Sequence, residues 1–123
     1  MPYQITRNNR GAYKKFSGFV TNAEFLQSVF ETQSDPDYDS MSYSINDFLG
    51  VTGHNIEPAG VKIVVAYGLG AAFINPKVKI AIVTVDQQIR DLVTLFAEQT
   101  RYPLEFFSTL AAARDWLELA EDD

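Results

Sequence analysis

The sequence predicts an α/β fold built on a mixed, mostly parallel sheet of about five strands, with helices on both faces. After an opening pair of strands, helical and strand patterns alternate in the order β-β-α-β-α-β-α-β-α. The segment from Val78 to Val85 is almost continuously apolar, which is typical of a parallel strand buried on both faces. We therefore expect right-handed crossovers and one domain over residues 1–123.

The first third of the chain predicts two strands and a capped helix. Residues 3–7 alternate in polarity, residues 8–11 are turn formers, and residues 12–16 return as the second strand. Thr21 and Glu24 then have the spacing of a capping box, in which each satisfies a free backbone donor of the other. A helix is expected from this point, with its apolar face formed by Phe25, Leu26, Val29 and Phe30.

The middle of the chain predicts a third strand, a loop and a buried helix. Residues 41–46 alternate as a strand, and the polar, glycine-punctuated stretch 47–57 is expected to be a loop. Residues 59–74 are too long for an ordinary strand and lie between Pro58 and Asn75, which favours a helix. A strand over residues 61–67 remains the alternative. In the helix, Gly68, Gly70, Ala71 and Ala72 are expected to let its backbone approach the sheet.

The last third predicts a helix, a short strand and a final helix. Asp86 is the expected cap of the first helix, and residues 104–107 form the strand. Ser108 is the expected cap of the last helix, whose inward-facing residues are Leu110, Ala113, Trp116 and Leu117.

Composition excludes several classes of partner and site. A net charge of −6 disfavours nucleic acid, because its binding depends on cations that meet phosphates. The chain has no cysteine, which excludes disulfides and thiolate metal sites and fits a reducing cytoplasm. The longest apolar run, residues 61–74, is too short for a bilayer span, and the N-terminal residues do not resemble a signal peptide. We expect a cytoplasmic protein that contacts no membrane.

Four basic residues, Arg7, Arg10, Lys14 and Lys15, lie close together near the N-terminus. Charges in such a run are usually solvated individually. The alternative is a basic patch that meets an acidic partner.

No combination of residues predicts catalysis, a metal or a cofactor. His54 is the single histidine, and no Gly-x-Ser-x-Gly motif accompanies it. Asp35, Asp37 and Asp39 lack the glycine and glutamate that a calcium loop needs. The glycines at 68 and 70 lie inside the predicted helix, and Phe73 replaces the third glycine of a dinucleotide fingerprint. We expect no enzyme activity and no cofactor.

The topology nevertheless predicts a binding rim, because ligands of open α/β sheets bind at the carboxyl ends of the strands. This rim is rich in hydroxyls and amides, and its two carboxylates would oppose an anion, which favours a protein partner or a neutral ligand. Its expected members are Thr21, Asp47, Thr52, His54, Asp86, Gln87, Ser108 and Thr109.

Three stretches, residues 46–52, 79–84 and 106–117, resemble the STAS/SpoIIAA-like superfamily. The resemblance implies a small bacterial protein with the SpoIIAA fold. Its better understood members bind an anti-sigma factor or a kinase and are switched by phosphorylation of a Ser at the start of the helix after the third strand. Here Asp47 and Gly50 match that motif, but Leu49 stands where its Ser would be. Thr52 is the nearest hydroxyl and becomes the candidate phosphoacceptor.

Together these features predict a non-catalytic regulatory or protein-binding module. The alternative is a carrier of a small apolar molecule or lipid, with an apolar cavity under the helix at 59–74. A weak homodimer is also expected, because Phe16, Phe19 and Tyr38 are not all expected to fit inside the core.

Overall fold

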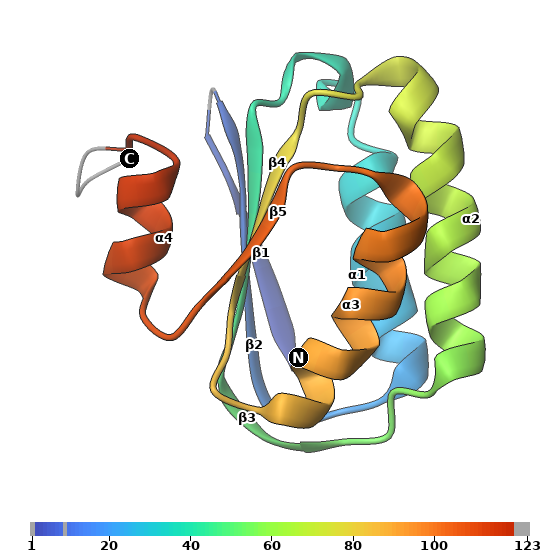
Figure 1. Ribbon diagram of the computed structural model, residues 1–123, viewed down its shortest axis with the longest axis vertical. Coiled ribbons are helices and arrows are strands. Elements are labelled where there is room, and N and C mark those ends of the chain that lie inside the picture. Colours follow the sequence, from blue (N-terminus) through green and yellow to red (C-terminus); the bar gives the residue numbers. More distant parts are fainter. Residues whose placement is uncertain (1, 9, 120–123) are drawn as a thin grey trace.

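A five-stranded sheet in the order β1-β2-β3-β4-β5 forms the centre of the computed structural model, which describes residues 2–8 and 10–119 (Figure 1). β1 is antiparallel to β2, and the neighbours β2–β3, β3–β4 and β4–β5 are parallel. The strands are β1 (Tyr3–Arg7), β2 (Gly11–Val20), β3 (Tyr43–His54), β4 (Lys79–Val83) and β5 (Leu104–Phe107). The predicted mixed, mostly parallel sheet and the predicted element order are confirmed.

Helices cover both faces of the sheet (Figure 1). On one face lie α1 (Asn22–Gln33), α2 (Pro58–Ile74) and α3 (Gln87–Thr100), and a short 3-10 turn, η1 (Tyr38–Ser40), follows α1. Of the helices in the described residues, only the short α4 (Leu110–Trp116) lies on the other face. Among the described residues, no helix has both the length and the apolar character that crossing a bilayer requires.

The predicted caps set where the helices begin. The Thr21 hydroxyl accepts a hydrogen bond from the Glu24 amide at 3.1 Å, and the Glu24 carboxylate accepts one from the Thr21 amide at 2.9 Å. This confirms the capping box. Asp86 caps α3 by accepting from the amides of residues 88 and 89. The last helix differs from expectation, because Thr109, and not Ser108, accepts from the Ala112 amide and caps α4.

The ambiguous segment is a helix, so the strand alternative over residues 61–67 is wrong. α2 ends at Ile74 and is followed by Asn75, whose side-chain amide donates to the carbonyls of Tyr38 and Met41, both at 2.8 Å. Gly68 does not serve contact with the sheet, because α2 is the helix farthest from the sheet and packs on α1 and α3 (Figure 1). Ala71 belongs to a buried cluster that includes Ala12 of β2. A Cβ at Gly68 would lie 2.9 Å from the Phe96 ring of α3. Gly68 therefore permits close packing between helices.

The expected loop at 47–57 is mostly strand, because β3 continues to His54 beside a β2 that continues to Val20. Their pairing has two register shifts, and Gly18 between them has a φ of +69°. Gly50 and Gly53 have low strand propensity, so the sequence pattern does not predict that β3 continues through them. At Gly50 the neighbouring strand is close, since a Cβ there would lie 3.1 Å from the Phe16 carbonyl oxygen.

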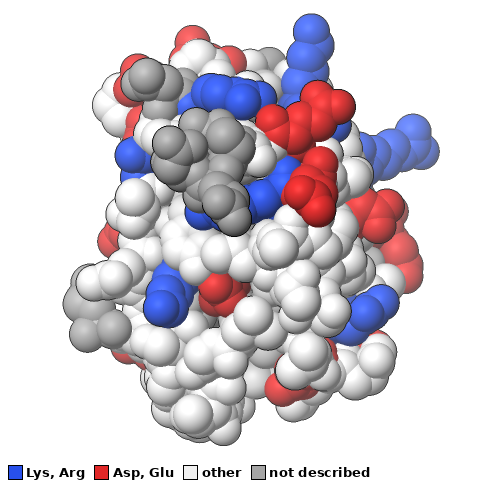
Figure 2. All heavy atoms as spheres, turned by 90° about the vertical axis from the view of Figure 1, so that its left-hand side faces the viewer, with Lys and Arg blue, Asp and Glu red and all other residues white. Residues whose placement is uncertain are grey.

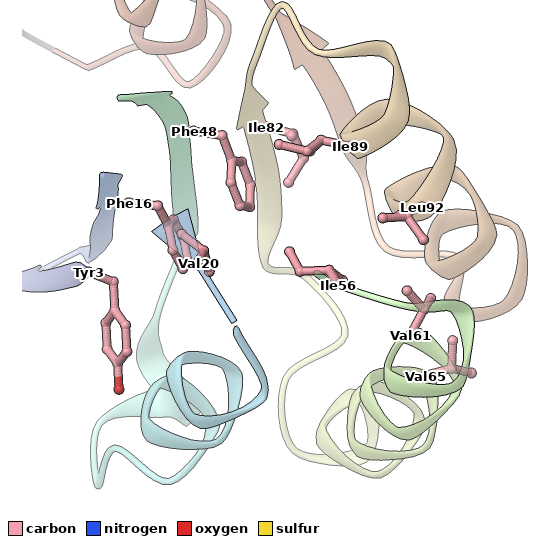
Figure 3. Close-up of a cluster of buried hydrophobic side chains, with 10 residues drawn as sticks. All are labelled: Tyr3, Phe16, Val20, Phe48, Ile56, Val61, Val65, Ile82, Ile89 and Leu92. Carbon is pink, nitrogen blue, oxygen red and sulfur yellow. The ribbon is translucent and has the colours of Figure 1, made fainter. Parts of the chain in front are cut away.

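The main core fills the space between the sheet and helices α1–α3. Phe16 of β2 and Phe48 of β3 stack with their ring centroids 4.6 Å apart, and Phe25 of α1 packs at a tilt against both. Figure 3 shows Phe16, Phe48 and Ile82 on the strands facing apolar side chains of the helices. A second core under α4 joins Ile45 and Val83 to the inward-facing residues expected for that helix.

We expect Phe16→Ala to lower the free energy of unfolding by about 3–5 kcal/mol, because its ring is fully buried and would leave a cavity. Phe19 lies on the same strand but is 56% exposed, so Phe19→Ala is the matched control and should change stability by less than about 1 kcal/mol. Urea unfolding of both variants measures the difference. Equal losses in the two variants would contradict this packing.

Candidate functional site

A cavity of about 100 Å³ lies between the sheet and helices α1, α2 and α3. Its walls are largely apolar and come from strands β3–β5 and from all three helices. Representative wall residues are Phe25, Val29, Val61, Val64, Ile82 and Leu92. Protein interiors have few voids larger than one water molecule, so a space of this size is a distinct feature of the core.

The floor of the cavity carries a polar group formed by Lys14, Ser44 and Asn46. Lys14 of β2 is the register partner of Asn46 on β3, so the two lie side by side on adjacent strands. Asn46 points its side-chain amide at the Ser44 hydroxyl, 3.4 Å away. Strand alternation puts these three residues on the same face as Phe16 and Phe48. The cavity is thus apolar around its walls and polar on one part of its floor.

Lys14 is the most unusual residue of the site. It is 4% exposed, and no hydrogen bond or ion pair joins it to any residue in the described ranges 2–8 and 10–119. Burial lowers the pKa of its ammonium group to about 8, and the attraction of the Glu31 carboxylate opposes this only in part. Buried cations are normally paired, because removing a charge from water is unfavourable. The cavity floor therefore presents an ammonium group that has Glu31 in its surroundings but no ion pair with a described residue.

The eight residues of the expected rim fall into separate groups. Thr21, Thr52 and His54 lie at the far end of the β2–β3 extension, whereas Asp86, Gln87, Ser108 and Thr109 follow the shorter strands β4 and β5. β4 ends at Val83, which is the partner of Asp47. β3 continues for seven residues beyond that point, so it ends about 20 Å farther along the sheet. The carboxyl ends of these strands do not form one common edge.

Asp47 lies inside β3 and not after it, as the sequence pattern suggested. Its carboxylate is buried on the α4 face, where it accepts from the Tyr13 hydroxyl at 2.5 Å and from the Leu49 amide at 3.0 Å. Burial and this hydrogen bond raise the pKa of Tyr13. Asp47 is therefore engaged in internal contacts and does not face the cavity.

Two other expected site residues have local roles. His54 accepts from the Ile56 amide through Nδ1 at 3.1 Å, and its buried Nε2 has no hydrogen-bond partner among the described residues. Thr52 is exposed on β3, six residues before α2 begins at Pro58. It does not occupy the helix start at which the resemblance places a phosphoacceptor.

The basic residues near the N-terminus do not form one patch. Arg7 pairs with Asp35 at 2.9 Å, and Lys14 points into the cavity. Arg10 borders a different hollow of about 410 Å³ with Lys77 and Lys79, which also includes acidic Asp39 and Glu118. On the face that carries α4, Lys and Arg side chains gather in the upper part with Asp and Glu beside them (Figure 2). The charge at this hollow is mixed.

Sequence reasoning missed Lys14 as a site residue because a lysine in a basic run resembles a solvated charge. The available signal was its position between Ala12 and Phe16, which alternation places on the same face of the strand. Both neighbours are fully buried. A lysine between two inward-facing apolar positions of a strand is expected to point inward as well.

No protein-family model matches the chain, and no curated protein matches its sequence. Among solved structures, the chain is similar to an uncharacterised DUF3478-family protein with a SpoIIAA-like fold from Shewanella loihica PV-4. The match has a TM-score of 0.61 and covers 94% of this chain and 91% of that one. This chain has a SpoIIAA-like fold. The identity is 17%, so the SpoIIAA-like match supports the fold and leaves the activity to be argued from the site.

We expect Lys14→Met to raise the free energy of unfolding at pH 7 by about 3 kcal/mol, because the folded state then no longer buries an ammonium group. In the wild type, the Lys14 pKa is about 8 in the folded state, against 10.5 for a lysine side chain in water. Between these values the unfolded chain binds more protons, so stability should rise from pH 8 towards 9.5. Above about pH 10 the raised pKa of Tyr3 should reverse the trend.

Urea unfolding at pH 7.0, 8.0 and 9.5 measures this effect. Lys15→Met is the matched control, because Lys15 is the exposed neighbour on the same strand. The control should keep the wild-type rise, whereas Lys14→Met should lose it. An unchanged rise in Lys14→Met would contradict the assignment of Lys14 as the buried titrating group.

Proposed function

We propose that this chain is a non-catalytic binding module that holds a small, largely apolar molecule in the cavity between its sheet and helices α1–α3. The observation that carries the proposal is the cavity itself, about 100 Å³ of space bordered by buried residues of the main core. Most of the side chains that line it are apolar, and such a surface favours contact with hydrocarbon over contact with water.

The chemistry of the lining supports binding over catalysis. The described residues around the cavity supply one amine together with hydroxyl and amide groups, and they include no carboxylate, imidazole or thiol. General acid–base catalysis most often uses a histidine or a carboxylate, and neither accompanies Lys14 in the lining. Apolar walls with a few convergent polar groups are instead typical of sites that hold a small molecule.

The proposal predicts that butan-1-ol binds in the cavity and that Val64→Phe prevents it. Butan-1-ol is a suitable probe because an apolar cavity of about 150 Å³ holds benzene, and this cavity is smaller. Val64 is buried and lines the space, so a phenyl ring there should fill it. Binding is measured by NMR titration of backbone amides around the cavity.

Val85→Phe is the matched control, because Val85 is 77% exposed and does not line the cavity. The control should bind butan-1-ol as the wild type does, and the amide spectra establish that each variant is folded. Failure of the wild type to bind, or equal binding in Val64→Phe, would contradict the proposed function.

A second candidate function is protein binding through the outer face of α2. Ile63, Tyr67 and Ile74 recur at helical spacing on this face and are all exposed. Phe30 of α1 extends the patch, with its ring 6.3 Å from that of Tyr67. Gly70 lies within the same stripe, and a Cβ there would meet open space. A second copy of the chain would present the same stripe, which suits a two-fold contact between α2 helices.

The homodimer was expected because Phe16, Phe19 and Tyr38 would not all fit inside the core. Phe16 and Tyr38 are buried, and of these three residues only Phe19 is exposed. The contact face for a dimer is then α2.

If α2 mediates self-association, sedimentation of the wild type should show the average mass rising as the protein concentration increases. Tyr67→Lys should shift this rise to higher concentration, because it puts a charge into the apolar stripe. Leu95→Lys, on the exposed part of α3, is the control for adding charge to a helix surface. A mass that stays at one chain throughout would contradict the dimer.

A further inference from the structure

We propose that the cavity takes a monoanionic ligand, a small apolar carboxylic acid whose carboxylate pairs with Lys14. This inference rests on the proposed function, because it names the ligand class of the same cavity. The geometry that supports it is the Lys14 side chain on one part of the floor and apolar side chains around the remainder. Lys14 is 4% exposed and forms no hydrogen bond or ion pair with a described residue. A carboxylate bound there would supply a close counter-ion, because Glu31 attracts Lys14 only from beyond ion-pair distance.

The neighbours of Lys14 suit a carboxylate as well. Asn46 lies beside Lys14 in the register of β2 and β3 and brings an amide that donates hydrogen bonds, and Ser44 brings a hydroxyl. Carboxylates accept several hydrogen bonds, and those from a charged donor are the strongest. The polar part of the floor therefore offers one charged donor and two neutral ones.

The surroundings favour one negative charge over two. Lys14 is the single cation among the described residues that line the cavity. Thr32 and Gln33 from the last turn of α1 also line it, and the end of a helix at which the carbonyls are free carries partial negative charge. Glu31 acts on Lys14 from the same turn. A phosphate, with close to two charges, would be repelled more strongly than a carboxylate.

The remainder of the ligand would contact hydrocarbon. Beyond the polar part of the floor, the lining includes Phe48 and Ile82 of the sheet with Ile89 and Leu92 of α3. Figure 3 shows these four side chains near one another between β3, β4 and α3. An alkyl chain is the group that such a surface binds best. The cavity volume limits this chain to a few carbon atoms.

The test compares butanoate with butan-1-ol, two probes of similar size that differ in charge. NMR titrations at pH 7 are performed on the wild type, on Lys14→Met and on the control Lys15→Met. We expect the wild type and Lys15→Met to bind butanoate at least tenfold more tightly than butan-1-ol. Lys14→Met should lose this preference and bind butanoate no more tightly than butan-1-ol.

The outcomes separate the two proposals. Binding of butan-1-ol without a preference for butanoate in the wild type would overturn the inference about the ligand and leave the proposed function intact. A preference that persists in Lys14→Met would also overturn it. If neither probe binds to the wild type, both the inference and the proposed function fail.

Discussion

The parallel pairing of β2 with β3 is the constraint on which the rest of the structure depends. Both strands lie inside the sheet, and their register puts Phe16 near Phe48 and Lys14 beside Asn46 on one face. A shift of one residue would exchange the two faces of a strand. The aromatic centre of the core and the polar floor of the cavity would then be lost together. The core and the candidate site are thus two consequences of one register.

The elements with strong local signals could be predicted from the sequence. The capping box at Thr21 and the apolar run of β4 depend on neighbouring residues, and both form as expected. The length of β3 could not be predicted, because Gly50 and Gly53 have low strand propensity and form part of the strand only beside β2. Tertiary pairing decides the structure of such a segment. The predicted rim also assumed that all the strands end at one level, whereas β3 extends beyond β4.

The cavity was anticipated only as an alternative, and its polar floor was not anticipated. A sequence shows that residues 59–74 are apolar, but it does not show how closely a helix approaches a sheet. Here α2 rests on α1 and α3, where Gly68 meets Phe96. Lys14 was hidden for a different reason, because a basic run normally indicates solvated charge. The Lys14 side chain points inward because alternation along β2 places it on the same face as Ala12 and Phe16.

Lys14 connects stability to binding. Burial lowers the pKa of Lys14 and disfavours its ammonium group, so the folded chain is less stable than it would be with an apolar side chain at this position. A ligand that pairs with the charge recovers part of this loss, and that recovery adds to its affinity. The effect applies to anions and not to neutral molecules of the same shape.

α2 connects the cavity to the outer surface, because Val61 and Val64 line the cavity while Ile63 and Tyr67 of the same helix face outward. A ligand that displaces α2 would therefore alter the outer apolar face in the same movement, since one rigid helix forms part of both surfaces.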